Sequence, residues 1–292
     1  MDKISEAMER ARRMDGGVGA PAATRSGRVT PLREPPVTAM PPEKGIRYTR
    51  TRTVEVSRKT MRENRIVAGF DSGPYKDAFK ILGTHILQRL KEGGWNALAI
   101  TSPGSREGKS LTAINVAISL GLEVDRTVLL VDADLRAPRI HRQFGLPDGP
   151  GLSDYLISDM PLENILIHPG LGRFVILPGG VPIRNSSELL GSEKMFQLVQ
   201  ELKGRYPARI VIFDLPPLLA AADALAFAPH VDAAVLVIEE GGTHREEVQR
   251  AANMLGTTPL IGTVLNKSVH AQAESKGENP GGWFARLRRR EA

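Results

Sequence analysis

From about residue 64 to residue 267, segments with continuous apolar residues take turns with segments in which apolar residues recur at helical spacing. Short continuous apolar runs, which are typical of fully buried strands, occur at residues 97–101, 128–131, 174–177, 210–213, 233–238 and 260–265. Amphipathic stretches with helical spacing occur at residues 75–90, 110–122, 187–204 and 243–255. Buried strands that alternate with helices predict an α/β fold with a mostly parallel sheet and helices on both faces. Because ligands bind at the carboxyl ends of the strands in such sheets, chemistry is expected directly after each strand.

The chain on either side of this region has a different composition. Residues 1–14 place Ile4 and Met8 on one stripe among charged residues, which predicts a short amphipathic helix suited to docking. Residues 15–66 are basic, rich in proline and glycine and without apolar periodicity, which predicts a flexible linker. We therefore expect one folded domain over residues 67–270 and a flexible basic tail over residues 271–292.

The overall composition narrows the class of protein. With 41% hydrophobic and 25% charged residues, the 292-residue chain is ordinary for a globular protein, which excludes collagen-like and wholly disordered classes. No apolar run reaches the roughly 18 residues that a membrane-spanning helix needs. The absence of cysteine excludes disulfides and thiolate metal sites. Residues 1–14 are too charged for a signal peptide, so the expected location is cytoplasmic.

Positive charge is concentrated at the two ends of the chain. Residues 1–66 hold 15 Lys/Arg and 8 Asp/Glu, whereas residues 67–270 hold 19 and 22. A nucleic-acid-binding domain is expected to carry its basic patch on the folded part, so we expect no nucleic acid as a partner. The basic ends fit an acidic partner or an anionic membrane surface, and they fit a solvated linker with no binding role equally well.

The clearest candidate site follows the apolar run at 97–101. A phosphate-binding loop and the start of the next helix are predicted at Gly104, Ser105, Arg106, Glu107, Gly108, Lys109, Ser110 and Leu111. Backbone N–H groups of such a loop, together with the helix N-terminus, attract phosphate oxygens. Lys109 is expected to reach the β- and γ-phosphates of a nucleotide, and the Ser110 hydroxyl is expected to ligate Mg²⁺. The loop departs from the usual pattern, because Pro103 stands where its first glycine is expected.

Acidic residues follow two later strands. Asp132 and Asp134 come directly after the run at 128–131, and Asp214 follows the run at 210–213. The first pair can hold Mg²⁺ directly or through water, or polarise an attacking hydroxyl; the structural alternative is that one aspartate caps a helix. Asp214 suits the outer shell of the same metal. The six histidines show no ligand spacing, so no metal beyond Mg²⁺ is predicted.

In this order the three motifs resemble the Walker A, Walker A′ and Walker B motifs of the bacterial tyrosine kinases of capsule and exopolysaccharide synthesis. Asp-Ala-Asp-Leu-Arg-x-Pro, from Asp132 to Pro138, is the most specific of them. The similarity runs from about residue 48 to residue 267, and residues 4–11 and 62–66 further resemble the exosortase-associated branch. The resemblance implies a P-loop NTPase fold like that of MinD and ParA. It also implies ATP with Mg²⁺, and a membrane-embedded polysaccharide chain-length regulator as partner at the inner face of the plasma membrane.

The resemblance also implies roles for individual residues. Lys109 and Ser110 hold ATP and Mg²⁺, Asp132 is a metal ligand and the candidate base, and Asp134 and Asp214 complete the metal site. A separate feature is Asn266, which stands where related ATPases contact adenine; a plain strand-end turn residue is the equal alternative. For the arginines that follow the acidic pair, phosphate or partner contact and a solvated face both stay open: Arg136, Arg139 and Arg142.

The chain departs from the resembled family in two further places. Family members carry a Glu-x-x-Arg-x-x-Arg pattern that builds ring-shaped oligomers, and the aligned residues here are Asp77, Lys80 and Gly83. A homo-oligomer is therefore left open as a partner. The family's kinases also end in a tyrosine-rich tail, whereas the tyrosines here are only Tyr48, Tyr75, Tyr155 and Tyr206.

Three functions fit these motifs. The leading interpretation is an ATP-dependent tyrosine kinase-like protein of exopolysaccharide synthesis. The alternative is an ATPase switch of the MinD/ParA type that phosphorylates nothing. Such switches carry a lysine four residues before the second loop glycine, and Gly104 at that position argues against this alternative. A nucleotide-binding adaptor with little turnover is the third.

Overall fold

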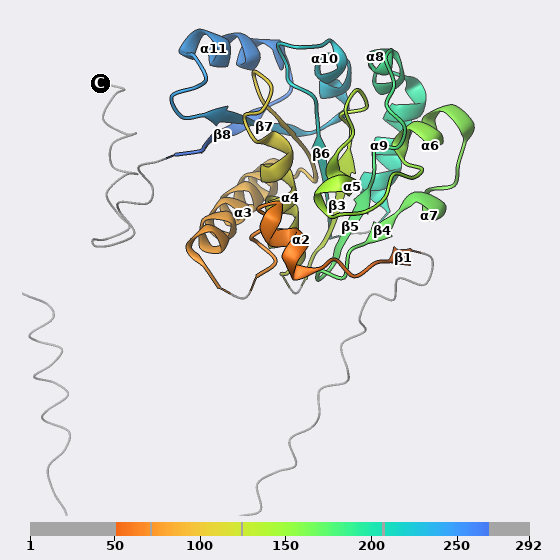
Figure 1. Cartoon of the computed structure of the whole chain (residues 1–292). Coiled ribbons are helices and arrows are strands. Elements are labelled where there is room, and N and C mark those ends of the chain that lie inside the picture. The colour runs from red at the N-terminus through yellow and green to blue at the C-terminus, as the bar shows by residue number, and fades with distance from the viewer. Residues whose placement is uncertain (1–50, 71, 124, 206–207, 269–292) are drawn as a thin grey trace, which may run out of the picture. The chain divides into compact units, whose positions relative to one another are not determined.

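The computed structural model describes residues 51–70, 72–123, 125–205 and 208–268 (Figure 1). These residues all belong to one compact unit of the chain, Ile46–Ala292. The predicted helix at 1–14, the predicted tail at 271–292 and residues 15–50 of the predicted linker lie outside the described residues.

An eight-stranded sheet forms the centre of the described unit, in the order β1-β4-β5-β3-β6-β2-β7-β8. The strands are β1 (Arg52–Thr53), β2 (Ala97–Thr101), β3 (Thr127–Asp132), β4 (Ile167–His168), β5 (Phe174–Leu177), β6 (Arg209–Asp214), β7 (Ala233–Glu239) and β8 (Leu260–Asn266). Neighbouring strands are parallel, apart from the antiparallel pair of β4 and β5. The mostly parallel sheet predicted from the apolar runs is therefore confirmed.

Helices cover both faces of this sheet (Figure 1). They are α2 (Arg58–Glu63), α3 (Pro74–Gly93), α4 (Lys109–Gly121), α5 (Ile140–Gln143), α6 (Leu152–Ser158), α7 (Leu162–Ile165), α8 (Ser186–Leu190), α9 (Glu193–Gly204), α10 (Asp223–Phe227), the 3₁₀ turn η1 (Ala228–His230) and α11 (Arg245–Met254). Within the described ranges, no helix is both long enough and apolar enough to cross a bilayer.

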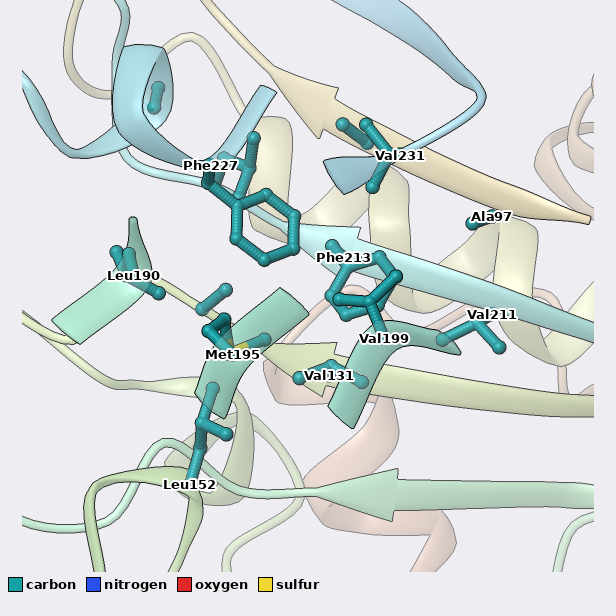
Figure 2. Close-up of a cluster of buried hydrophobic side chains, with 14 of the residues drawn as sticks. Ala97, Val131, Leu152, Leu190, Met195, Val199, Val211, Phe213, Phe227 and Val231 are labelled. Carbon is teal, nitrogen blue, oxygen red and sulfur yellow. The ribbon is translucent and has the colours of Figure 1, made fainter. Parts of the chain in front are cut away.

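Side-chain alternation along the strands creates two separate hydrophobic cores. On β2, Leu98 and Ile100 face α3 and α4, whereas Ala97 and Ala99 face the opposite side. Figure 2 shows part of the second core, where Phe213 of β6 lies near Phe227 of α10 with ring centroids 4.9 Å apart. A strand buried on both sides cannot shift by one residue without exchanging its two faces, so this packing fixes where each strand ends.

One predicted helix is divided into two. The apolar spacing predicted a single helix over residues 187–204, but the structure has α8 and α9, separated at Gly191 and Ser192. The Ser192 hydroxyl accepts a hydrogen bond from the Met195 backbone N–H at 3.2 Å and so caps the start of α9. Helical periodicity continued across this cap, which is why the interruption was not predicted.

The prediction of a linker up to residue 66 is wrong for its described part. Residues 51–66 contain β1 and α2, and Met61 and Ile66 are buried in the core beside α4. The buried Asn115 of α4 holds the next residues, because its Oδ1 accepts from the N–H groups of Val67 and Ala68 at 2.8 and 2.9 Å. Long-range packing and hydrogen bonding therefore order a segment whose own composition is polar.

Helix α3 approaches α4 closely at Gly83, one of the residues aligned with the ring-forming pattern. Gly83 is buried, and a Cβ atom there would lie 3.3 Å from Leu120 Cδ2 of α4. A Cβ atom at this position would require the Leu120 side chain to shift by a few tenths of an ångström. In the structure this position thus serves the contact between two helices of the same chain.

Candidate functional site

The loop between β2 and α4 has an unusual backbone at two residues. Gly108, the N-cap of α4, has a φ of 95°, and a Cβ atom there would lie 2.0 Å from Asn266 Nδ2. Arg106 has a φ of 67°, a left-handed conformation that costs a residue with a side chain about 1–2 kcal/mol. Strained backbone of this kind is concentrated at ligand-binding loops. The local conformation therefore agrees with a loop that presents its backbone to a ligand.

Residues from two other strand ends hold this loop in place. The buried Glu107 carboxylate accepts from the Gly104 N–H at 2.9 Å and from the Thr243 hydroxyl, which follows β7, at 2.5 Å. The Asn266 amide, at the end of β8, donates to the Glu107 carbonyl at 2.8 Å. The sequence analysis did not identify Thr243, although its place after a strand next to β2 was the available signal. For Asn266, a strand-end contact with the loop is observed, and adenine contact stays a prediction.

Lys109 lies inside a cluster of acidic groups at the carboxyl edge of the sheet. Its Nζ is 2.8 Å from Asp134 Oδ2, 3.5 Å from Asp214 Oδ1 and 3.3 Å from the Ser110 hydroxyl. The Lys109 side chain is only 10% exposed. The three predicted motifs therefore meet at one point, although they are far apart in the sequence.

The register of the sheet brings two of these carboxylates side by side. Asp132 ends β3 and Asp214 ends β6, and the two residues are directly paired in the parallel ladder. Asp214 is also the register partner of Ile100 on β2, whose strand leads into the loop. Strand pairing alone is thus sufficient to place the acidic residues next to the phosphate loop.

The two oxygens of Asp132 have different surroundings. Oδ2 accepts from the N–H groups of Arg139 and Ile140 at 2.8 and 2.9 Å, at the start of α5. Oδ1 is buried and has no hydrogen-bond partner in the described structure. The helix-capping alternative therefore holds for one oxygen, while the other stays available to a ligand.

Burial controls the protonation of this cluster. Burial and the neighbouring Asp214 raise the pKa of Asp132 to about 7, even though the α5 N–H groups and Lys109 oppose this rise. Burial also raises the pKa of Asp214 against the effect of Lys109. For Lys109 itself, burial would lower the pKa, but Asp214 and Asp134 outweigh it and the net shift is upward. Lys109 is therefore charged, and Asp132 can exchange a proton near neutral pH.

The residues at this edge fit a magnesium ion that shares its ligands with a phosphate. Asp132 Oδ1 and Asp214 Oδ2 are both buried without a partner in the described structure, and the Ser110 hydroxyl lies beside Lys109. No group of three or more His, Cys, Asp or Glu side chains is arranged as a complete metal site within the described ranges. Mg²⁺ commonly takes only one or two carboxylates and completes its shell with water and substrate oxygens. Asp134, predicted as a further ligand, pairs with Lys109 in this structure, and its role as a metal ligand stays a prediction.

Two of the arginines that follow Asp134 form ion pairs within the chain. Arg136 Nε lies 3.0 Å from Asp223 Oδ1, and the same buried carboxylate accepts from the Ser186 hydroxyl. Arg142 Nε lies 3.0 Å from Asp148 Oδ1 on the surface. These arginines therefore serve contacts with the loops around the site, and Arg136 ties the Asp134 segment to α10.

Relatives of this chain carry names that agree with the site. No family model matches the sequence. The tyrosine-protein kinase YwqD of Bacillus subtilis (strain 168) is 34% identical over 192 residues, which are 65% of this chain and 80% of YwqD. The putative tyrosine-protein kinase CapB of Staphylococcus aureus is 30% identical over 193 residues, which are 65% of this chain and 83% of CapB. Among solved structures, the kinase domain of the Escherichia coli tyrosine kinase ETK matches with a TM-score of 0.65 and 28% identity, covering 74% of this chain and 88% of that domain.

Proposed function

Because the chain belongs to the family of bacterial tyrosine-protein kinases, we propose that its loop and strand-end carboxylates bind ATP and direct the terminal phosphoryl group to a tyrosine hydroxyl. The observation that carries this proposal is the position of Lys109, within 3.5 Å of both Asp134 and Asp214 at the end of the phosphate loop. A lysine at that point is the cation nearest to any phosphate that the loop accepts.

Lys109 exchanges carboxylate partners for phosphate oxygens when nucleotide enters. Its attraction to Asp134 and Asp214 keeps the ammonium charged and close to the loop. Ser110 and Asp214 would hold Mg²⁺, and the ion would supply neutralisation of the phosphate charge. Asp214 Oδ2, which has no partner within the described structure, would be available to this ion, and Asp132 Oδ1 would stay available as a proton acceptor.

Asp132 accepts the proton of the tyrosyl hydroxyl. A base is most effective when its pKa lies near the operating pH, and in the absence of metal burial raises the pKa of Asp132 to about 7. Its Oδ2 is fixed by the start of α5, so Oδ1 keeps one orientation toward the edge of the sheet. A rigid acceptor avoids the reorganisation that a mobile side chain would need.

The proposed cellular setting is exopolysaccharide synthesis at the inner face of the plasma membrane, in the cytoplasm. There the chain works with a membrane-embedded regulator of polysaccharide chain length. One support is the resemblance of the motifs to those of the kinases of this process. The other is that Lys and Arg outnumber Asp and Glu within residues 1–66, which suits a contact with an acidic partner or an anionic surface.

Incubation of the purified full chain with γ-labelled ATP and Mg²⁺, alone and with the cytoplasmic segment of the membrane partner, tests this proposal. We expect label on tyrosine of the chain or of its partner. Label found only in free phosphate identifies an ATPase switch instead, and nucleotide binding without either product identifies an adaptor. Lys109→Met serves as the inactive control.

A further inference from the structure

A groove lies at the carboxyl edge of the sheet, next to the end of β5 and beside the proposed catalytic residues. Helix α6 forms one wall, with Ile157, and residues 181–184 between β5 and α8 form the other, with Val181 and Arg184. The hollow has a volume of about 340 Å³. Val181 and Ile157 are 63% and 61% exposed, which makes them the most exposed of the large hydrophobic side chains in the described part of the chain.

The two walls of the groove are held at a fixed separation. The backbone N–H groups of Leu152 and Ser153 donate to the carbonyls of Pro178 and Gly179 at 2.7 and 3.0 Å. Gly180 has a φ of 82°, and a Cβ atom there would lie 2.2 Å from the Ser153 hydroxyl. The apolar residues are therefore exposed on a rigid frame, which lowers the entropy cost of binding a partner.

The same segment is tied directly to the proposed catalytic carboxylates. The Ile183 N–H donates to the carbonyl of Leu135, the residue after Asp134, at 2.8 Å. A Cβ atom at Gly179 would lie 3.2 Å from the Asp132 carbonyl. Because β3 and β5 are parallel neighbours, the groove and the carboxylates open at the same edge of the sheet.

Charge indicates what occupies the groove. Arg184 is exposed and forms no ion pair with any described residue. The Asp154 carboxylate also lines the groove, and it accepts a hydrogen bond from the Gly151 N–H at 2.8 Å. An unpaired guanidinium beside two apolar side chains suits a carboxylate next to an aromatic or aliphatic group.

We propose that this groove docks the acceptor polypeptide, as an extended segment in which the target tyrosine is accompanied by acidic residues. A carboxylate of the segment pairs with Arg184, and an apolar or aromatic side chain packs on Ile157 and Val181. The tyrosine hydroxyl is thereby presented to Asp132. This proposal rests on the proposed kinase function, which leaves open how the acceptor is held.

The test measures steady-state phosphorylation of a synthetic Glu/Tyr copolymer and of a Lys/Tyr copolymer by the full chain. Three exposed positions are varied: Ile157→Ser, Val181→Ser and Arg184→Glu. Matched controls make the same changes elsewhere, at Ile81 on α3 (Ile81→Ser) and at Arg250 on α11 (Arg250→Glu). Because all these side chains are at the surface, the urea concentration at the midpoint of unfolding should be the same for each variant as for wild type.

Arg184→Glu should raise the KM for the Glu/Tyr copolymer about tenfold, a loss typical of one to two kcal/mol at a charged contact, and should favour the Lys/Tyr copolymer. Ile157→Ser and Val181→Ser should raise the KM for both copolymers. The KM for ATP should not change in any variant. A wild-type acceptor KM in Arg184→Glu, or an equal change in Arg250→Glu, overturns the proposal.

Fluorescence anisotropy of a labelled Glu/Tyr copolymer separates failure of the groove from failure of the kinase function. If the wild-type chain transfers no phosphate but binds the copolymer, and Arg184→Glu weakens that binding about tenfold, docking stands and the kinase function fails. Binding that is absent, or equal in all variants, overturns docking. If Val181→Ser changes only the sedimentation of the chain, the groove is an interface between copies and the proposal fails.

Discussion

Asp132 and Asp214 stand opposite each other at the ends of β3 and β6. Both side chains are fully buried, and each keeps one carboxylate oxygen without a hydrogen-bond partner in the described structure. Burial raises the pKa of both groups, and their proximity adds to the rise for Asp132. This edge of the sheet therefore requires positive charge, and Lys109 supplies it in the absence of nucleotide.

Lys109→Met should lower ATP turnover at least about 100-fold, as expected when a preorganised contact to the reacting phosphate is removed. The variant should also lose about 3 kcal/mol of unfolding free energy, because it leaves buried carboxylates without their cation. Release of labelled phosphate and urea unfolding measure the two effects. Lys91→Met, on the exposed end of α3, is the matched control. Wild-type turnover in Lys109→Met would refute the phosphate-loop assignment.

Asp132→Asn and Asp132→Ala should separate the two oxygens of this side chain. Asparagine keeps an acceptor for the N–H groups of Arg139 and Ile140, so near pH 4, where the folded Asp132 is also neutral, the stability of this variant should stay close to wild type. Its turnover at neutral pH should fall sharply. Alanine should lose the same turnover and a further 1 kcal/mol or so of unfolding free energy, because the start of α5 loses its cap. Equal turnover in wild type and Asp132→Asn would transfer the catalytic role to Asp214.

The stability of the chain without nucleotide or metal should depend on pH through Asp132. The folded pKa is about 7, whereas the ordinary value is 3.8, so between these values the folded state binds more protons than the unfolded state. Raising the pH from 4 to 7 should therefore destabilise wild type relative to Asp132→Asn, by on the order of 3 kcal/mol. Urea unfolding in EDTA across this range measures the difference. A constant difference would contradict the raised pKa.

Gly108→Ala should strongly weaken nucleotide binding, for two separable reasons. The new Cβ would lie 2.0 Å from Asn266 Nδ2, and the φ of 95° is unfavourable for alanine by about 1–2 kcal/mol. Adding Asn266→Ala removes the clash but not the backbone strain. The double variant should therefore recover part of the affinity, measured by calorimetry with ADP. If the losses of affinity in the two single variants simply added up in the double variant, the clash with Asn266 would not be the cause of the weakened binding.

Of Tyr48, Tyr75 and Tyr155, only Tyr48 should be phosphorylated within the chain, because it belongs to the predicted flexible linker. Tyr155 is partly buried in α6 with the Lys194 ammonium 5.2 Å from its ring centroid, so it should stay unmodified. Tyr75 lies in the first turn of α3 and would have to leave the helix to reach an active site. Mass spectrometry after incubation with ATP and Mg²⁺ maps the sites, with Tyr48→Phe as the control. Phosphate on Tyr155 would contradict this expectation.

The sequence was sufficient to predict the sheet and the meeting of its three motifs. Continuous apolar runs identified the strands, and a parallel sheet has its carboxyl ends along one edge, so Lys109, Asp132 and Asp214 were expected at that edge. The resemblance to the kinase motifs placed them in one site, and the strand order β3-β6-β2 brings them together. The separate contacts of the acidic residues could not be predicted. Whether Asp134 pairs with Lys109, or Asp132 caps α5, depends on side-chain directions that strand order does not determine.

The ordered segment before residue 67 could not be predicted for a different reason. Its order depends on contacts with α4, which is distant in the sequence: Met61 enters a core, and Asn115 satisfies two backbone N–H groups. The bridge from Glu107 to Thr243 is likewise a long-range contact. Local composition carries no information about partners 47 to 136 residues away in the sequence.

Close contact between α3 and α4 at Gly83 also has an evolutionary consequence. A Cβ atom at this position would lie 3.3 Å from Leu120 Cδ2, so alanine needs the leucine side chain to shift slightly, and a longer residue also needs space that Leu120 now fills. Substitutions at the two positions should therefore appear together in diverging lineages.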